Sequence, residues 1–311
     1  MRSAQHRLLL GIGMQQLFRG DTVTLTEGSV LERVSRQAPA LIDPSIGYAG
    51  MLDSQQGRQM LIAIWKEYAT AAGPFPIVIH TPTWRCGQDR MAKARRPKSQ
   101  PEENAVNLLR DAVPEAIVAG LMGPKGDCYT PSEAPDREAA HKYHAWQVER
   151  MVEADCDFLL AATLPALSEA LGIADAFEQT DLNYVLSFVL RADGCLLDGT
   201  PLVEAIAAID DRERPPAQYW INCTHPEVFA TAMKESRELN ATAAARVQGF
   251  QANTSPRDPE ELDALTSLET MRPEDFASSL AVLRSEFGLN LLGGCCGTRA
   301  VHIHALAMAL A

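Results

Sequence analysis

The fold is indicated most clearly by the stretch Gln218-Tyr219-Trp220-Ile221-Asn222-Cys223-Thr224-His225-Pro226. Its first five residues are mostly aromatic or apolar and predict a buried β-strand over 218–222. Proline is favoured in the first turn of a helix, so Pro226 predicts a helix over 226–236. A strand that runs through a short loop into a helix is typical of βα units and of a parallel sheet. Cys223 falls directly at the end of the strand.

The same alternation continues along the chain in both directions. It predicts eight strands, over 22–25, 76–81, 116–122, 157–162, 184–190, 218–222, 246–252 and 290–292. It predicts helices over 55–72, 137–154, 167–177, 201–209 (with Thr200 as N-cap), 226–236, 273–286 and 300–310. Eight βα units predict an α/β fold, a single-domain (β/α)₈ TIM barrel. The alternative, a doubly wound open sheet, lacks a Gly-x-Gly-x-x-Gly turn after the first strand.

Length and composition restrict the function classes. A chain of 311 residues with 46% hydrophobic content has material for a large core, and we expect the barrel over 21–311 after an N-terminal extension over 1–20. The net charge of -12 argues against nucleic acid as a partner. The one basic run, over 90–98, is interpreted as a solvated loop. We expect no membrane span, because no apolar run is long enough. The sequence leaves the oligomeric state open.

Three of the seven cysteines predict a metal site. Cys223 follows the sixth predicted strand, and Cys295 and Cys296 follow the eighth in Gly293-Gly294-Cys295-Cys296-Gly297-Thr298. In a parallel barrel the ends of the strands meet on one rim, so all three should lie together. Three thiolates with one open position are typical of catalytic Zn²⁺. The alternatives are buried core cysteines or a metal-free redox group.

The odd number of scattered cysteines favours reduced thiols in a cytoplasmic protein. Adjacent cysteines seldom reach disulfide geometry without strain, so Cys295 and Cys296 are not expected to pair with each other. A free thiol is only a few per cent thiolate at neutral pH, and zinc removes the proton. A zinc site on the rim of a barrel therefore predicts chemistry on a thiol.

These motifs resemble the zinc-dependent homocysteine S-methyltransferases. The resemblance rests on Asn222-Cys223-Thr224-His225-Pro226 and on the double-cysteine motif, with support from 123–126, 144–147, 198–200 and 251–253. It implies a (β/α)₈ barrel, three cysteine ligands to zinc, and transfer of a methyl group to a zinc-bound thiol. The small-molecule partners it implies are homocysteine, which gives methionine, and a sulfonium donor, S-methylmethionine or S-adenosylmethionine.

Further site residues follow from the resemblance and from position. Glu27 and Gly28 stand where the family has Asp-Gly, which implies that Glu27 binds a substrate ammonium; the alternative is a solvated loop acid. Ala162 stands where better-known members have a glutamate for the amino group, and the loop over 29–33 departs from the pattern. Trp84 offers an aromatic face to a cationic donor or packs at the rim.

Two asparagines lie at the ends of strands near the predicted metal site. Asn222 and Asn253 could contact a substrate carboxylate, orient the zinc ligands, or simply end their strands. The alternatives to methyl transfer to homocysteine are a methyltransferase for another thiol and a zinc-dependent thiol-binding or sensing protein without methyl transfer.

Overall fold

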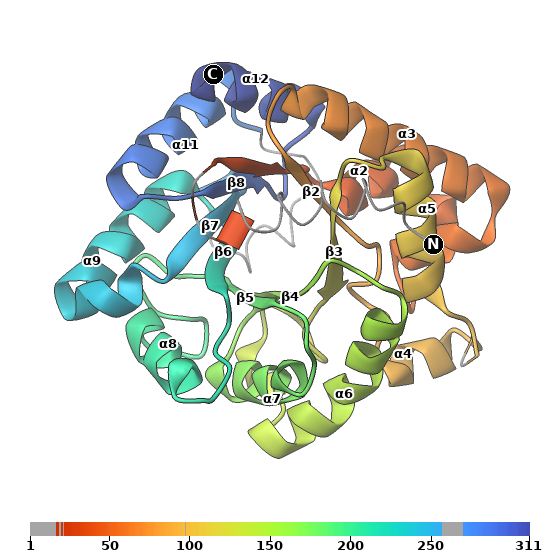
Figure 1. The fold of residues 1–311 in the computed structure, drawn as a ribbon, viewed down its shortest axis with the longest axis horizontal. Helices are drawn as coiled ribbons and strands as arrows, with labels where there is room; N and C mark the ends of the chain where they lie inside the picture. Colours follow the sequence, from red (N-terminus) through yellow and green to blue (C-terminus); the bar gives the residue numbers. More distant parts are fainter. Residues whose placement is uncertain (1–16, 19, 21, 97, 257–269) are drawn as a thin grey trace.

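A closed barrel of parallel strands forms the centre of the molecule, surrounded by a ring of helices (Figure 1). The computed structural model describes residues 17, 18, 20, 22–96, 98–256 and 270–311. Within these residues eight strands pair in chain order, and β8 closes the barrel against β1. The strands are β1 (Thr24–Thr26), β2 (Ile77–His80), β3 (Ile117–Met122), β4 (Phe158–Leu164), β5 (Tyr184–Phe188), β6 (Gln218–Thr224), β7 (Val247–Ala252) and β8 (Leu291–Gly294). The predicted barrel is confirmed, and the open sheet is excluded.

The helices cover the outside of this barrel. They are α2 (Val30–Gln37), α3 (Gln55–Ala72), α4 (Gln88–Lys93), α5 (Pro101–Ala112), α6 (Arg137–Glu153), α7 (Leu167–Glu178), α8 (Leu202–Asp210), α9 (Pro226–Ala244), α11 (Pro273–Phe287) and α12 (Ala300–Leu310), with short 3₁₀ helices at Pro39–Leu41, Tyr48–Asp53 and Pro131–Glu133. None of the helices in these ranges is long and apolar enough to cross a membrane.

Apolar side chains fill two layers of the structure. Both faces of the strands are buried, as expected of a parallel sheet covered by helices. One cluster lies inside the barrel and includes Phe158, Leu160 and Trp220, and a larger one lies between the strands and the helices. Leu17 is buried with the inner cluster, and its carbonyl accepts hydrogen bonds from Gln218 and Asn290, at or just before the start of β6 and β8. Residues 1–16 of the expected extension lie outside the described residues.

Three local predictions are wrong. The first part of the basic run at 90–98 is not a loop, because 88–93 form α4 with Met91 buried. Residues 29–33, which we expected to form a loop, are instead the start of α2: Ser29 caps the helix by accepting a hydrogen bond from the Glu32 backbone. Helix α8 begins at Leu202 with Pro201 as its N-cap, in place of the predicted start at Pro201 after Thr200.

Candidate functional site

Cys223 projects from a bulge near the end of β6. Its neighbours Asn222 and Thr224 pair with Gln251 and Ala252 of β7, so Cys223 is an extra residue in the ladder. It has a φ of 51°, in the left-handed region that costs a non-glycine residue roughly 1–2 kcal/mol. Bulges often occur next to active sites, where they re-aim a side chain. The bulge thus places the Cys223 thiol where a regular strand would not.

A second bulge in β4 is bonded to the first. Pairing between β4 and β5 shifts after Ala161, and Thr163 has a φ of 65°. The Asn222 Oδ1 accepts from the Thr163 backbone at 2.9 Å and from Ser187 Oγ at 2.7 Å, and Asn222 Nδ2 donates to Thr163 Oγ1 at 2.8 Å. All these side chains are buried. The geometry makes Asn222 a support for the two bulges.

Cys295 and Cys296 lie in a tight turn after β8. The Cys295 backbone donates to the Ala252 carbonyl at 2.7 Å, and the Thr298 hydroxyl donates to the Cys295 carbonyl at 2.6 Å. A side chain at Gly294 would collide with Thr298, which explains the glycine. Gly297 has a φ of 83°, and its N–H donates to Glu32 of α2 at 2.6 Å. Helix α2 therefore holds the cysteine turn in place.

The three predicted ligands come together as expected. The Sγ atoms of Cys223, Cys295 and Cys296 all lie within 4.8 Å of one another, and burial decreases in that order. Sulfurs bound to one tetrahedral zinc are roughly 3.8 Å apart, given Zn–S bonds of about 2.3 Å. Cys223 and Cys295 are paired as a disulfide with their Cα atoms 5.5 Å apart, which differs from the predicted reduced thiols. The same closeness permits a shared ion once the pair is reduced.

Asn253 lies directly beside the buried cysteine. Its Nδ2 donates to the Cys223 carbonyl at 3.2 Å, and its backbone N–H donates to Thr224. Its Oδ1 is buried and has no hydrogen-bond partner among the described residues. A buried carbonyl oxygen without a donor costs free energy, so this atom is a candidate for contact with a ligand.

Glu27 is buried at the end of β1 and bonds to a residue that the sequence analysis missed. Its Oε1 lies 2.7 Å from His80 Nδ1 and accepts the His80 backbone N–H at 2.9 Å. The alternative of a solvated loop acid is wrong, since Glu27 is only 4% exposed. A Cβ on Gly28 would lie 2.7 Å from Thr298 Oγ1, so Gly28 allows close packing of the first loop on the cysteine turn.

Trp84 closes the side of the rim formed by β3 and β4. Its indole N–H donates to the Ala162 carbonyl at 3.1 Å, and a side chain at Gly123 would collide with its ring. The Arg85 guanidinium lies 5.3 Å from the ring centre. The Ala162 side chain packs with Trp84 in the inner core cluster. The aromatic face predicted for a donor already carries one cation.

Buried polar residues of α6 and α7 hold the loops after β2 and β3. Glu169 Oε1 accepts the Lys125 backbone N–H at 2.7 Å and lies 2.8 Å from His144 Nε2. Gln147 donates to the Thr83 carbonyl at 2.8 Å. Tyr129, in the loop after β3, packs in the cluster that contains Cys223 and Cys295. These helices therefore position loops at the rim.

Burial favours the neutral forms of two titratable side chains near the cysteines, Cys128 and His225. Burial raises the pKa of the Cys128 thiol to about 12, and nearby Asp127 adds to the shift. Burial lowers the pKa of His225, which accepts the Glu227 N–H as N-cap of α9. Neither residue is a thiolate or a cation at neutral pH.

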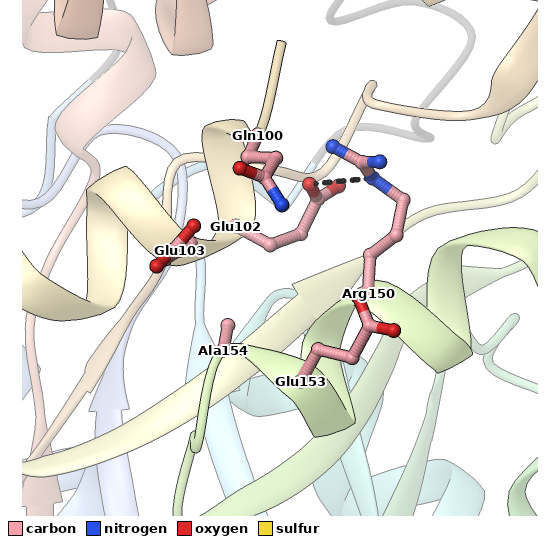
Figure 2. Close-up of a pocket in the computed structure, with 6 residues that line it drawn as sticks. All are labelled: Gln100, Glu102, Glu103, Arg150, Glu153 and Ala154. Atoms are coloured by element: carbon pink, nitrogen blue, oxygen red, sulfur yellow. Dashed lines mark hydrogen bonds and ion pairs between the residues drawn. The ribbon is translucent and has the colours of Figure 1, made fainter. Parts of the chain in front are cut away.

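A separate pocket lies in the outer layer between α5 and α6 (Figure 2). It is lined by Gln100, Glu102, Glu103, Arg150, Glu153 and Ala154. Glu102 Oε2 pairs with Arg150 Nε at 3.1 Å, and burial raises the pKa of Glu102 against the opposing effect of Arg150. The pocket shares none of its lining residues with the cysteine rim.

Comparison with known proteins gives consistent results. The family model described as "Homocysteine S-methyltransferase" matches residues 24–310. Similar proteins include "Homocysteine S-methyltransferase YbgG" of Bacillus subtilis (26% identical, 66% of this chain and 64% of that protein) and "Homocysteine S-methyltransferase" of Escherichia coli (29%, 61% and 61%). The aligned part thus spans less than two thirds of each relative. The solved metallated form of the E. coli homocysteine methyltransferase MmuM has a similar fold, with a TM-score of 0.74, 22% identity and coverage of 95% of this chain and 99% of that chain.

Proposed function

The chain belongs to the homocysteine S-methyltransferase family, and on that premise we propose that it is a zinc-dependent thiol S-methyltransferase. The acceptor is homocysteine, which gives methionine, and the donor is a sulfonium compound, S-methylmethionine or S-adenosylmethionine. The observation that carries the proposal is the approach of three sulfurs within 4.8 Å at the ends of β6 and β8. The catalytic unit is the barrel over 21–311, after an N-terminal extension over 1–20.

The residues at the rim fit one zinc ion. Cys223, Cys295 and Cys296 would hold it, with a fourth position left for the substrate. Zinc supplies one thing: it keeps the acceptor thiol deprotonated and therefore nucleophilic. The disulfide pair must be reduced for this, which favours a reducing compartment, the cytoplasm.

Other residues of the chain orient the two substrates. The free oxygens of Glu27 and Asn253 are buried without partners in the described residues, and a donor group of the substrate, such as its ammonium at Glu27, would satisfy each of them. Gly28 allows the first loop to approach closely. Asn222 keeps Cys223 in its strained conformation. Trp84 forms a wall of the rim, and a sulfonium donor would compete with Arg85 for its ring.

Methyl transfer is a single displacement. The bond that forms joins the acceptor sulfur to the methyl carbon. The bond that breaks joins this carbon to the sulfonium sulfur, which keeps the electron pair and leaves as a thioether. No proton moves in this step, so the protein contributes alignment of the reacting atoms.

One observation favours a second candidate function. The Cys223–Cys295 pairing is what a metal-free redox group would use. Ala162 concerns the identity of the acceptor. Alanine offers no carboxylate to an amino group, so methylation of another thiol, or thiol binding without transfer, is an alternative outcome of the test.

Zinc content and methyl transfer test the proposal together. The reduced wild type and Cys296→Ser are assayed for bound zinc, and for methionine formed from homocysteine and S-methylmethionine or S-adenosylmethionine. Cys195→Ser, a partly exposed cysteine in the loop after β5, is the matched control. We expect about one zinc per chain in the wild type and control, lost in Cys296→Ser together with activity. Bound zinc without methionine formation would keep the metal site but exclude homocysteine as the acceptor. Reduced protein without zinc would overturn the metal site.

A further inference from the structure

Four buried residues at β1, β2 and β7 form a closed hydrogen-bond network beside the cysteine turn. Thr26, Glu27, His80 and Gln251 are all at most 8% exposed. Thr26 Oγ1 donates to the Glu27 carbonyl at 3.1 Å, and Gln251 Nε2 donates to Thr26 Oγ1 at 3.1 Å. The Glu27 carbonyl also accepts from Gly294, which directly precedes Cys295. The network therefore connects the first strand to the cysteine turn.

The network fixes the tautomer of His80. Gln251 Nε2 lies 3.4 Å from His80 Nε2 and is a donor, so this ring nitrogen accepts. The ring proton is then on Nδ1, which lies 2.7 Å from Glu27 Oε1. His80 thus donates twice to the same carboxylate oxygen, from its ring and from its backbone.

The two oxygens of Glu27 differ as a result. Oε1 is held by His80, whereas Oε2 is buried and has no partner among the residues the structure describes. An ionised carboxylate oxygen without a donor is costly in a buried place, and an ammonium group supplies the donor and the opposite charge. The Glu27 backbone carbonyl bonds to Gly294 of β8, the strand that leads into the cysteine turn.

We propose that His80 is a positioning residue that fixes Glu27 and presents Oε2 to the α-ammonium group of the acceptor. This rests on the proposed function and deepens it: His80 sets the orientation in which Glu27 meets the amino group of the acceptor. Glutamate is one methylene longer than aspartate, and His80 removes the rotational freedom that this methylene adds.

The test compares ligands that differ only in the amino group. For zinc-loaded protein, kcat/KM is measured with L-homocysteine and with 4-mercaptobutyrate. For metal-free, reduced protein, the dissociation constants of L-methionine and 4-(methylthio)butyrate are measured by calorimetry. The wild type should prefer the amino-bearing partner of each pair by roughly 10-fold or more, as loss of a charge-assisted hydrogen bond implies.

Three variants separate positioning from folding. His80→Leu removes the ring donor and should lose most of the preference, mainly through KM for homocysteine. His80→Asn places an N–H donor the same number of bonds from the backbone as Nδ1. This variant should keep the preference for the amino-bearing ligand within about 3-fold of the wild type. Glu27→Gln should lose the preference as His80→Leu does, and the double variant should lose no more.

The outcomes are distinguishable from failure of the proposed function. An unchanged preference in His80→Leu, or equal loss for both members of a pair, would overturn the role of His80. A wild type without preference would also overturn it. If the wild type methylates neither thiol, the proposed function fails, and the binding ratio of the methionine pair still decides the role of His80.

Discussion

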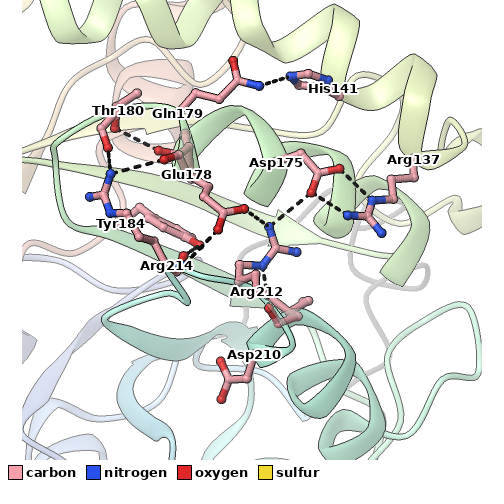
Figure 3. Close-up of polar contacts among 12 residues, drawn as sticks. Arg137, His141, Asp175, Glu178, Gln179, Thr180, Tyr184, Asp210, Arg212 and Arg214 are labelled. Atoms are coloured by element: carbon pink, nitrogen blue, oxygen red, sulfur yellow. Dashed lines mark hydrogen bonds and ion pairs between the residues drawn. The ribbon is translucent and has the colours of Figure 1, made fainter.

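The cysteine rim and the charged cluster on α6, α7 and the loop after α8 differ in how completely their polar atoms are paired. In the cluster, Arg137 binds both oxygens of Asp175 at 2.6 and 2.8 Å, and Arg212 reaches Asp175 and Glu178 (Figure 3). At the rim, Glu27 and Asn253 each keep a buried oxygen without a partner in the described chain. Paired charges stabilise a surface, whereas an unpaired buried oxygen at the rim can accept a hydrogen bond from a ligand.

Backbone conformation shows the same difference. Thr163 and Cys223 have positive φ angles at the rim, while Arg137, Asp175 and Glu178 of the charged cluster lie on the regular helices α6 and α7. Strain of this kind persists only where the surrounding structure holds it, and here Asn222 does so. The difference separates a region built for chemistry from one built for stability.

The largest effect should come from Cys223→Ser. A hydroxyl at this position is a poor zinc ligand, so methyl transfer should fall by more than about 100-fold, beyond the usual effect of changes around the ligands. The free energy of unfolding of the reduced, metal-free protein should change far less. Steady-state kinetics and urea unfolding measure the two quantities. A large loss of unfolding free energy alongside the loss of activity would mean that Cys223 is a core residue.

Asn222→Leu should have the next effect. It leaves the Thr163 N–H and two hydroxyls without their partner, which should lower the free energy of unfolding by about 2–4 kcal/mol. Zinc affinity should fall by about 10–100-fold, because the bulge that aims Cys223 loosens. Calorimetry and denaturant unfolding check both values. An unchanged zinc affinity would contradict the coupling between the bulges.

Asp175→Asn should have a smaller effect, confined to stability. The cluster is partly exposed, so the loss should be about 1 kcal/mol or less. Methyl transfer should stay within about 2-fold, since the change only affects outer helices. A fall in activity of much more than 2-fold would mean that the charged cluster and the cysteine rim are coupled.

The pH dependence of this loss should be the smallest effect. Burial would raise the pKa of Asp175, but the hydrogen bonds and charges of Arg137 and Arg212 outweigh it and lower the pKa. The ionised form therefore stabilises the fold above the unfolded pKa of about 3.9, and this contribution disappears as pH falls through the lower folded pKa. The stability difference between wild type and Asp175→Asn should be constant from pH 8 to 5 and shrink below pH 4. A constant difference down to pH 3 would contradict the lowered pKa.

Most of the fold could be predicted because strands and helices alternate with clear periodicity. Both ends of the helices over 55–72 and 300–310 agree with the structure. Helix α2 was missed, although Ser29 and Glu32 have the spacing of a capping box, because the family pattern suggested a loop there. Helix α5 was missed too, although Pro101 followed by Glu102 and Glu103 is typical of the first turn of a helix.

The approach of the three cysteines could be predicted from the strand order, but the details of the site could not. The Thr163 and Cys223 bulges depend on Asn222, which lies 59 residues from Thr163. The contact of His80 with Glu27 spans 53 residues. Such contacts follow from pairing of strands and from side-chain packing, and local propensity contains no information about them.

Closure of the barrel has a consequence for how the protein folds. β8 pairs with β1, and this step brings Glu27 and the cysteine turn together. Contacts between residues so distant in sequence form slowly, so the site should be among the last parts of the molecule to assemble. A ligand that binds across the β1–β8 seam stabilises only the closed form, by about 2.7 kcal/mol at a concentration 100 times its Kd. Bound substrate would then slow the separation of β1 from β8 and so the unfolding of the barrel.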